Sequence, residues 1–267
     1  MRSIPCAARG AAYSNFNALV LTAVGGILFS SANSYGVIII DDFSAPTAPS
    51  AYVIDLINPD PYLLKTGSLA GILGGERDLL VDVMMDDPGP VSATGSVGGG
   101  LNGSYVFGTV RAGAKATLQY DGFDADQPDA PASLVNAQAL PHINLAAGGN
   151  LGVRLDFASI EAGLGTALSV VIVVTSTSGS ATFENGIPQN PSPTSYFVPF
   201  AAFTETALFT WADVTSLQFT FNGSGVPDVD FELDQIVADI PEPSIVALMA
   251  GGAVLGFRFR RRVRAAQ

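Results

Sequence analysis

The sequence predicts an all-β protein: an antiparallel β-sandwich of the jelly-roll type, with an N-terminal signal helix and a single C-terminal membrane helix. Short apolar or alternating runs, separated by Gly, Pro, Asn and Asp, follow one another from residue 36 to residue 239. No convincing amphipathic helix interrupts them, which makes a parallel βαβ sheet improbable. We therefore expect a signal peptide at 1–34, the sandwich domain at 35–240 and a separate tail at 241–267.

Twelve runs are expected to form the strands of the sandwich. The run 167–177 is nearly all β-branched, so we place it in the interior of a sheet. The runs 104–112 and 114–124 are predicted to form a hairpin around Gly113. The other runs are 36–43, 51–57, 78–85, 150–159, 180–184, 195–203, 207–211, 214–223 and 229–239.

The first 34 residues have the three parts of a secretory signal peptide. Arg2 and Arg9 precede an apolar run at Ala18–Phe29, and small residues of the cleavage-site type follow at Ser30, Ala32 and Ser34. Cleavage after Ala32 or after Ser34 fits the pattern, and we favour Ser34. There is no twin arginine, so the segment resembles a substrate of the Sec export machinery. The alternative is a first transmembrane anchor.

Removing both ends leaves a strongly acidic body. Residues 35–240 keep five basic and 23 acidic side chains, a formal net charge of −18. Such a body is a poor partner for nucleic acid and a good partner for divalent cations. The only cysteine, Cys6, lies in the signal segment, which excludes disulfides and thiolate chemistry from the mature chain. The only histidine, His142, excludes a multi-histidine zinc site, and we expect it to be an ordinary surface histidine or one whose hydrogen bonds are satisfied within the fold.

The C-terminal tail combines a stiff step, an apolar run and a basic end. Pro241, Glu242 and Pro243 form an extended segment through which no helix can run, and Ser244 follows as an N-cap. No charged residue occurs from Ser244 to Phe257. A short membrane helix is predicted there, held on its cytoplasmic side by Arg258, Arg260, Arg261, Arg262 and Arg264. The alternative is a buried C-terminal helix of a globular domain.

The order of these tail features resembles the PEP-CTERM sorting signal of Gram-negative bacteria. The resemblance covers about the last 27 residues. It implies recognition by an exosortase, a membrane-embedded cysteine-type transpeptidase that cuts near the Pro-Glu-Pro triplet. It further implies transient residence in the inner membrane, followed by delivery to the cell surface or extracellular matrix, often alongside exopolysaccharide production.

The body resembles, at the level of pattern, the galactose-binding-like jelly rolls of carbohydrate-binding modules. The resemblance rests on the opening "DDF" run and on "DFELDQI" at Asp230–Ile236 near the end of the body. It implies that the first and last strands are neighbours. Carboxylates brought together in this way repel each other unless a cation intervenes. We therefore expect a structural Ca²⁺ site at Asp41, Asp42, Glu232 and Asp234, the alternative being solvated strand ends.

Two function classes remain open for the body. The first is a non-catalytic surface or matrix protein, which could bind exopolysaccharide through exposed aromatic residues. Trp211 and Tyr196 are the candidates for this contact, with Tyr120 and Tyr62 considered beside them. The second is a secreted carbohydrate-active enzyme, a glycoside hydrolase or lyase. Acidic residues are abundant, but the sequence identifies no catalytic residue, and the nucleophile elbow Gly-x-Ser-x-Gly is absent.

Overall fold

The computed structural model describes residues 36–44, 52–55, 62–66, 71–86, 91–98, 103–122, 140–161, 167–223 and 228–240. The expected signal peptide at 1–34 and the expected membrane helix at Ser244–Phe257 lie outside these ranges. Within the described ranges, no helix has the length and apolar character needed to cross a membrane.

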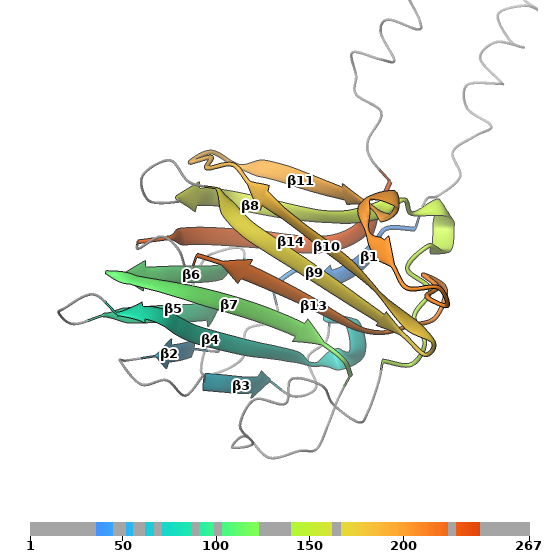
Figure 1. Cartoon of the computed structure of the whole chain (residues 1–267), viewed down its shortest axis with the longest axis horizontal. Helices are drawn as coiled ribbons and strands as arrows, with labels where there is room; N and C mark the ends of the chain where they lie inside the picture. Colours follow the sequence, from blue (N-terminus) through green and yellow to red (C-terminus); the bar gives the residue numbers. More distant parts are fainter. Residues whose placement is uncertain are drawn as a thin grey trace, which may run out of the picture. The chain divides into compact units, whose positions relative to one another are not determined.

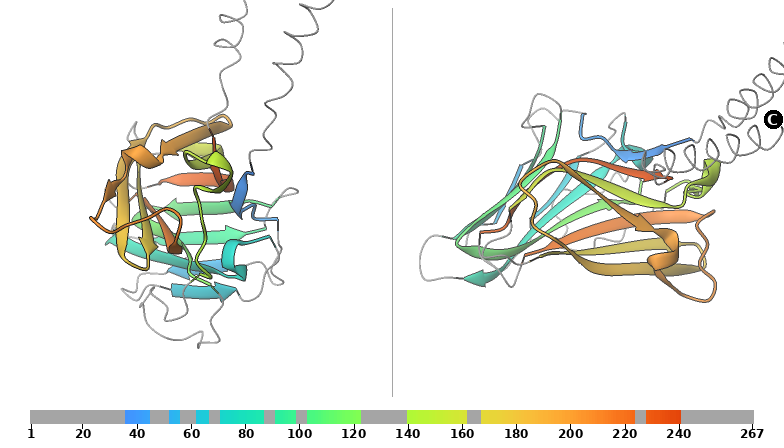
Figure 2. Two further views of the ribbon diagram at one scale, coloured as in Figure 1. Left: turned by 90° about the vertical axis from the view of Figure 1, so that its right-hand side faces the viewer. Right: turned by 90° about the horizontal axis from the view of Figure 1, so that it is seen from above.

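The body is a sandwich of two seven-stranded sheets, as Figures 1 and 2 show. The first sheet has the order β11 (Thr194–Pro199), β8 (Gly152–Glu161), β14 (Asp230–Asp239), β6 (Tyr105–Val110), β5 (Ser92–Val97) and β2 (Tyr52–Asp55), and β1 (Ile38–Asp41) also pairs with β14. The second sheet has the order β12 (Thr204–Glu205), β10 (Gly179–Ile187), β9 (Leu168–Ser176), β13 (Val214–Asn222), β7 (Ala112–Tyr120), β4 (Arg77–Asp86) and β3 (Tyr62–Thr66).

Every strand pairing in these two sheets is antiparallel. The helices of the described ranges are three-residue 3-10 turns: η1 (Leu73–Gly75), η2 (Ala147–Gly149) and η4 (Phe200–Ala202). The predicted all-β antiparallel sandwich is therefore confirmed.

The hydrophobic core lies between the sheets and follows from the alternation of each strand. In β9 every second side chain from Leu168 is buried, and β13 contributes Leu217, Phe219 and Phe221 in the same way. Phe231 of β14 is the centre of an aromatic cluster. Its ring centroid lies between 4.8 and 6.1 Å from the rings of Tyr105, Phe107, Phe157 and Phe221.

The hairpin predicted around Gly113 is wrong. β6 belongs to the first sheet and β7 to the second, so the chain changes layer between them at Arg111. Arg111 takes a left-handed conformation, with φ of 55°, and its backbone N–H donates to the Asp228 carboxylate at 2.8 Å. Periodicity shows which residues face inward, but it does not show whether the chain turns back within a sheet or crosses to the other one.

Further strand predictions need correction, since β3 and the two-residue β12 were not among the predicted runs. Residues 207–211 form turns instead of a strand, because Phe209 and Trp211 pack into an aromatic cluster at this end of the molecule. β5 was missed because its small polar residues lack a strand-like composition. Gly95 is required in β5, since a Cβ atom there would lie 2.7 Å from the Tyr105 hydroxyl oxygen.

The first and last strands of the body are neighbours, as expected. Ile38 lies opposite Ala238 and Ile39 opposite Val237. β6 pairs with an earlier part of β14, from Phe231 to Leu233, and β8 pairs along nearly its whole length. β14 is therefore the strand on which β1, β6 and β8 of the first sheet assemble.

Candidate functional site

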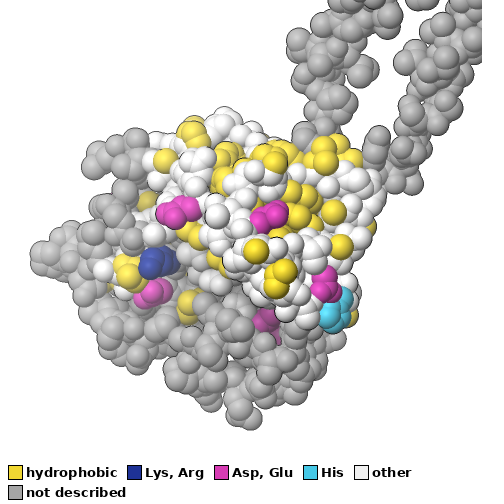
Figure 3. All heavy atoms as spheres, turned by 45° about the vertical axis from the view of Figure 1, so that its right-hand side comes forward, with side chains coloured by type: hydrophobic (Ala, Val, Ile, Leu, Met, Phe, Trp, Pro, Cys, Tyr) yellow, Lys and Arg dark blue, Asp and Glu magenta, His cyan; other side chains and the backbone are white. Residues whose placement is uncertain are grey.

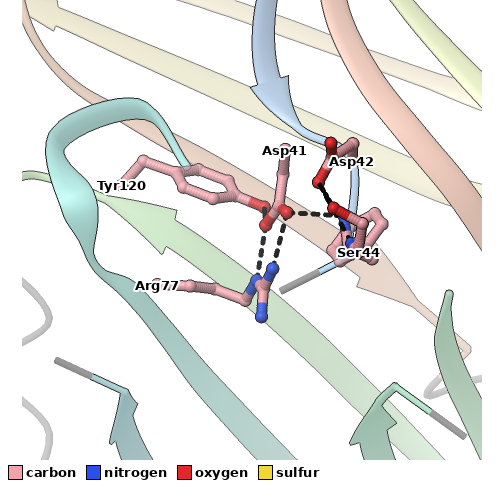
Figure 4. Close-up of polar contacts among 6 residues, drawn as sticks. Asp41, Asp42, Ser44, Arg77 and Tyr120 are labelled. Atoms are coloured by element: carbon pink, nitrogen blue, oxygen red, sulfur yellow. Dashed lines mark hydrogen bonds and ion pairs between the residues drawn. The ribbon is translucent and has the colours of Figure 1, made fainter. Parts of the chain in front are cut away.

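A buried polar cluster fixes the end of β1 between the two sheets (Figure 4). The guanidinium of Arg77 donates two hydrogen bonds of 2.5 Å to the two carboxylate oxygens of Asp41. The Tyr120 hydroxyl donates to the same carboxylate at 2.8 Å, as does the backbone N–H of Phe43 at 2.8 Å. The side chains of both ionic partners are fully buried. The cluster thus ties β1 of the first sheet to β4 and β7 of the second.

The surroundings raise the pKa of both Arg77 and Tyr120. Burial lowers the pKa of Arg77, but the hydrogen bond and the charge of Asp41 outweigh it, so the pKa is raised. Burial raises the pKa of Tyr120, and the charge of Asp41 raises it further. The guanidinium carbon also lies 4.9 Å from the centroid of the Phe43 ring, within cation–π range. Tyr120 is therefore a core residue, and its consideration as a sugar platform is wrong.

The structure does not assemble the four expected calcium ligands into one group. Arg77 already balances the charge of Asp41, while Asp42 accepts hydrogen bonds from the backbone and hydroxyl of Ser44. Glu232 accepts a hydrogen bond of 2.7 Å from the hydroxyl of Ser104. Among the residues with described side chains, no three His, Cys, Asp or Glu side chains lie close enough together to hold a metal ion. Calcium binding stays a prediction without geometric support.

Asp234 occupies an irregular position on β14. The register of β14 with β8 shifts between Leu233 and Gln235, so Asp234 is the extra residue of a β-bulge. Burial raises the pKa of its carboxyl group, and the charges of Glu232 and Asp156 raise it further. Asp156 in turn accepts hydrogen bonds from Arg154 and from the hydroxyl of Ser195.

Trp211 is half-buried in an aromatic cluster at the end of the second sheet. Its ring stacks on Phe200 with centroids 3.9 Å apart and meets Phe203 and Phe209 edge to face at 5.0 and 4.9 Å. Its indole N–H donates to Glu205 at 2.7 Å. One ring face is therefore covered by protein, which leaves less aromatic surface for a sugar than an open platform would offer.

Tyr196, the other candidate sugar contact, is also half-buried. It lies on β11, at the edge of the first sheet, and its hydroxyl accepts a hydrogen bond of 3.2 Å from the amide of Asn185 on β10. The side chain of Tyr62 lies outside the described part of the chain.

The outer face of the second sheet is a polar surface that sequence reasoning did not select. The register places Glu184, Val171 and Thr220 in one row across three strands, and the row continues to Thr117 on β7, which is buried. The next row holds Thr182, Val173 and Gln218, and it continues to Gln119 on β7, which is also buried. Charged side chains are few among the uncharged ones on the described part of the side that Figure 3 shows. The alternation of "TSLQFTFN" in β13 is the sequence signal for this face, because it leaves hydroxyl and amide groups outside.

His142 lies at the surface, one of the two positions expected for it. Its side chain is 62% exposed, and its Nδ1 atom lies 2.5 Å from the carboxylate of Asp213. The Thr177 hydroxyl donates to Asp213 and not to the imidazole. A serine-protease-like arrangement would need the hydroxyl on the histidine, so this group does not have that geometry.

Comparison with protein families identifies the tail. The model described as "PEP-CTERM protein-sorting motif" matches residues 239–262. The match begins at Asp239, the last residue of β14, and includes the Pro241-Glu242-Pro243 triplet. No curated protein matches the chain.

The solved structures that resemble this chain do so with low TM-scores and low sequence identity. A family 11 carbohydrate-binding module from Clostridium thermocellum, in complex with a β-1,3-1,4-mixed-linked tetrasaccharide, matches with a TM-score of 0.39 and 11% identity, over 76% of this chain and 95% of that chain. An agarase matches with a TM-score of 0.39 and 8% identity, over 77% of this chain and 25% of that chain. These values are too low to carry an argument about function.

The assignment therefore rests on the tail. The motif marks the protein for export and for exosortase-dependent delivery to the surface or the extracellular space. This chain is a PEP-CTERM sorting motif-containing protein, in which the motif directly follows a two-sheet β-sandwich.

Proposed function

We propose that this protein is an exported component of the cell surface or extracellular matrix, sorted by an exosortase. The Sec machinery carries it through the inner membrane, and the signal peptide is removed. The tail then holds the body at the membrane until the exosortase cuts near Pro241-Glu242-Pro243. The observation that carries this proposal is the sorting motif at residues 239–262, which begins where the last strand of the sandwich ends.

The mature body acts, in this proposal, as a non-catalytic binder of neutral exopolysaccharide. The outer face of the second sheet offers amides and hydroxyls such as Gln218, Thr220 and Thr182, which can donate to and accept from sugar hydroxyls. Val171 and Val173 between them provide apolar contact for sugar C–H groups. The net charge of −18 on the body disfavours an acidic polymer. Trp211 and Tyr196 remain proposed contacts through the parts of their rings that are exposed.

The second candidate is the secreted carbohydrate-active enzyme. One observation favours it: burial raises the pKa of Asp234, the charges of Glu232 and Asp156 raise it further, and a general acid in a glycosidase needs a raised pKa. An activity assay separates the non-catalytic binder from the enzyme. The mature protein is incubated with a panel of polysaccharides, and the products are tested for new reducing ends or unsaturated sugars. If the parent protein forms such products and the Asp234→Asn variant does not, the result favours the enzyme.

The sorting step is tested by replacing Pro241, Glu242 and Pro243 with alanine in cells that contain an exosortase. The altered chain should remain in the inner membrane with its tail attached, whereas the parent reaches the surface. The matched control is the same replacement at Pro191-Ser192-Pro193, an exposed Pro-x-Pro step within the body, which should leave sorting unchanged. Normal processing of the first variant would refute the proposal.

The binding step is tested with the mature protein on an array of neutral and acidic glycans. Gln218→Ala and Thr220→Ala should weaken binding to a neutral glycan by about tenfold, the effect of about 1.4 kcal/mol in lost hydrogen bonds. Ser96→Ala on the first sheet is the control and should bind as the parent does. Equal binding by all these proteins would exclude the outer face of the second sheet as the sugar site.

A further inference from the structure

The two ends of the body leave it at the same edge. Since β1 and β14 are antiparallel and Ile38 lies opposite Ala238, the residues before β1 lie beside the end of β14. Figure 2 shows β1 in blue next to the red end of β14. On the other side of β14, the backbone N–H of Leu151 donates to the carbonyl of Asp239 at 3.0 Å.

The segment between this edge and the uncharged run of the tail is short. Only Ile240, Pro241, Glu242 and Pro243 separate Asp239 from Ser244, where the uncharged run begins. A fully extended chain advances about 3.3–3.6 Å per residue, so the Cα atoms of Asp239 and Ser244 are at most about 18 Å apart. As long as the run lies in the bilayer, the edge stays within that distance of the place where the run enters it.

The composition of the edge fits a lipid surface. Among the described residues, seven large hydrophobic side chains are exposed, and three belong here: Val37 at 48%, Ile39 at 45% and Leu151 at 56%. The nearby carboxylate of Asp239 is bound by Arg154 and is only 11% exposed. An otherwise strongly acidic body thus presents exposed apolar side chains, with a neutralised carboxylate beside them, at the end of β14 that leads into the tail.

We propose that Val37, Ile39 and Leu151 form a membrane-facing edge that rests in the headgroup region of the bilayer while the tail is attached. The inference rests on the proposed membrane attachment of the tail. Apolar side chains at an interface gain free energy in proportion to the area removed from water, and the short tether keeps their effective concentration at the bilayer high. The contact gives the body a fixed orientation, with both chain ends toward the membrane, before the tail is cut.

The experiment uses single cysteines, since Cys6 is the only natural one. Full-length chain carrying Cys6→Ser is produced in a host without exosortase, purified from the membrane and reconstituted in vesicles of about three parts phosphatidylethanolamine to one part phosphatidylglycerol. Fluorophores are placed at Ile39→Cys or Leu151→Cys and exposed to lipids that carry a spin-label quencher. The controls are Val110→Cys and Met84→Cys, which replace side chains that are 56% and 49% exposed.

Val110 is a matched control because it lies at the opposite end of β14. The backbone N–H groups of its neighbours Thr109 and Arg111 donate to Asp230 and Asp228. The ten residues of β14 span about 30 Å at about 3.3 Å per residue, so Val110 is remote from the edge.

Quenching at positions 39 and 151 should exceed that at positions 84 and 110 by at least about twofold, since a headgroup-level probe is close to the labelled lipid. Equal quenching at all four positions would overturn the inference. A further label at Ala250→Cys reports on the tail itself. Strong quenching there without quenching at the edge refutes only the membrane-facing edge. No quenching at position 250 refutes the proposed attachment and the inference together.

Discussion

The first and the last strand of the body, β1 and β14, each carry an aspartate that is paired with an arginine. The two ion pairs differ in how far they are exposed to water. Arg77 pairs with Asp41 of β1, with both side chains fully buried. Arg154 pairs with Asp239 of β14, with side chains 24% and 11% exposed. Both contacts are ion pairs between a guanidinium and a carboxylate. Water can take the place of the partner far more easily at the Arg154–Asp239 pair than at the buried Arg77–Asp41 pair. Burial, more than the presence of an ion pair, therefore decides what each contributes to stability.

The largest expected effect is at the buried pair. Arg77→Met leaves the carboxylate of Asp41 without its ionic partner inside the core, which should lower the free energy of unfolding by about 3–5 kcal/mol. Chemical denaturation of the mature protein measures this. The double variant Asp41→Leu with Arg77→Met removes both charges and should recover much of the loss. A loss below about 1 kcal/mol for Arg77→Met alone would mean that the pair is not buried as described.

A smaller effect is expected from the tyrosine in the same cluster. Tyr120→Phe removes a hydrogen bond to a charged acceptor and should cost about 1.5–3 kcal/mol. Tyr105→Phe is the matched control, since the Tyr105 hydroxyl is fully buried and has no hydrogen-bond partner within the described ranges. That control should be neutral or slightly stabilising. Equal losses for the two variants would show that the cluster does not depend on the hydrogen bond to Asp41.

At the partly exposed pair, Arg154→Gln should cost no more than about 1 kcal/mol. The loss should shrink further in about 0.5 M salt, because ions screen a partly exposed pair. Denaturation of parent and variant at both salt concentrations measures this. A loss as large as that of Arg77→Met would contradict the comparison between the two arginines.

The smallest effect concerns the pH dependence contributed by Asp234. Because its pKa is raised by burial and by the charges of Glu232 and Asp156, the folded state holds this proton more tightly than the unfolded state does. The contribution of Asp234 to stability therefore falls as the pH rises through the range between the unfolded and the folded pKa. Asp234→Asn should be slightly more stable than the parent at neutral pH, and this advantage should vanish in acid. An advantage that persists in acid would assign the effect to packing instead.

The sequence was sufficient where a local pattern decides the outcome. The alternation of apolar and polar residues in 214–223 and 229–239 predicted the bounds of β13 and β14 to within a residue or two. The sorting motif was recognised in the sequence from Pro241 onward. The resemblance of the body to jelly rolls correctly implied that β1 and β14 pair.

The sequence was insufficient where distant residues decide the outcome. Nothing local to Asp41 indicates that Arg77 lies against it, so two adjacent acidic residues suggested a cation site. Tyr120 follows an ordinary strand pattern, and only the packing of both sheets shows that its ring is inside. The crossing at Arg111 depends on a left-handed backbone conformation in a non-glycine residue, which composition does not reveal.

The central claim is that this sandwich is delivered by cleavage of its tail, and the intact mass of the protein recovered from the cell surface tests it most directly. The account predicts a chain that begins near Tyr35 and ends at or near Pro241-Glu242-Pro243, without the arginines at 258–264. Surface protein that still ends at Gln267 would contradict it.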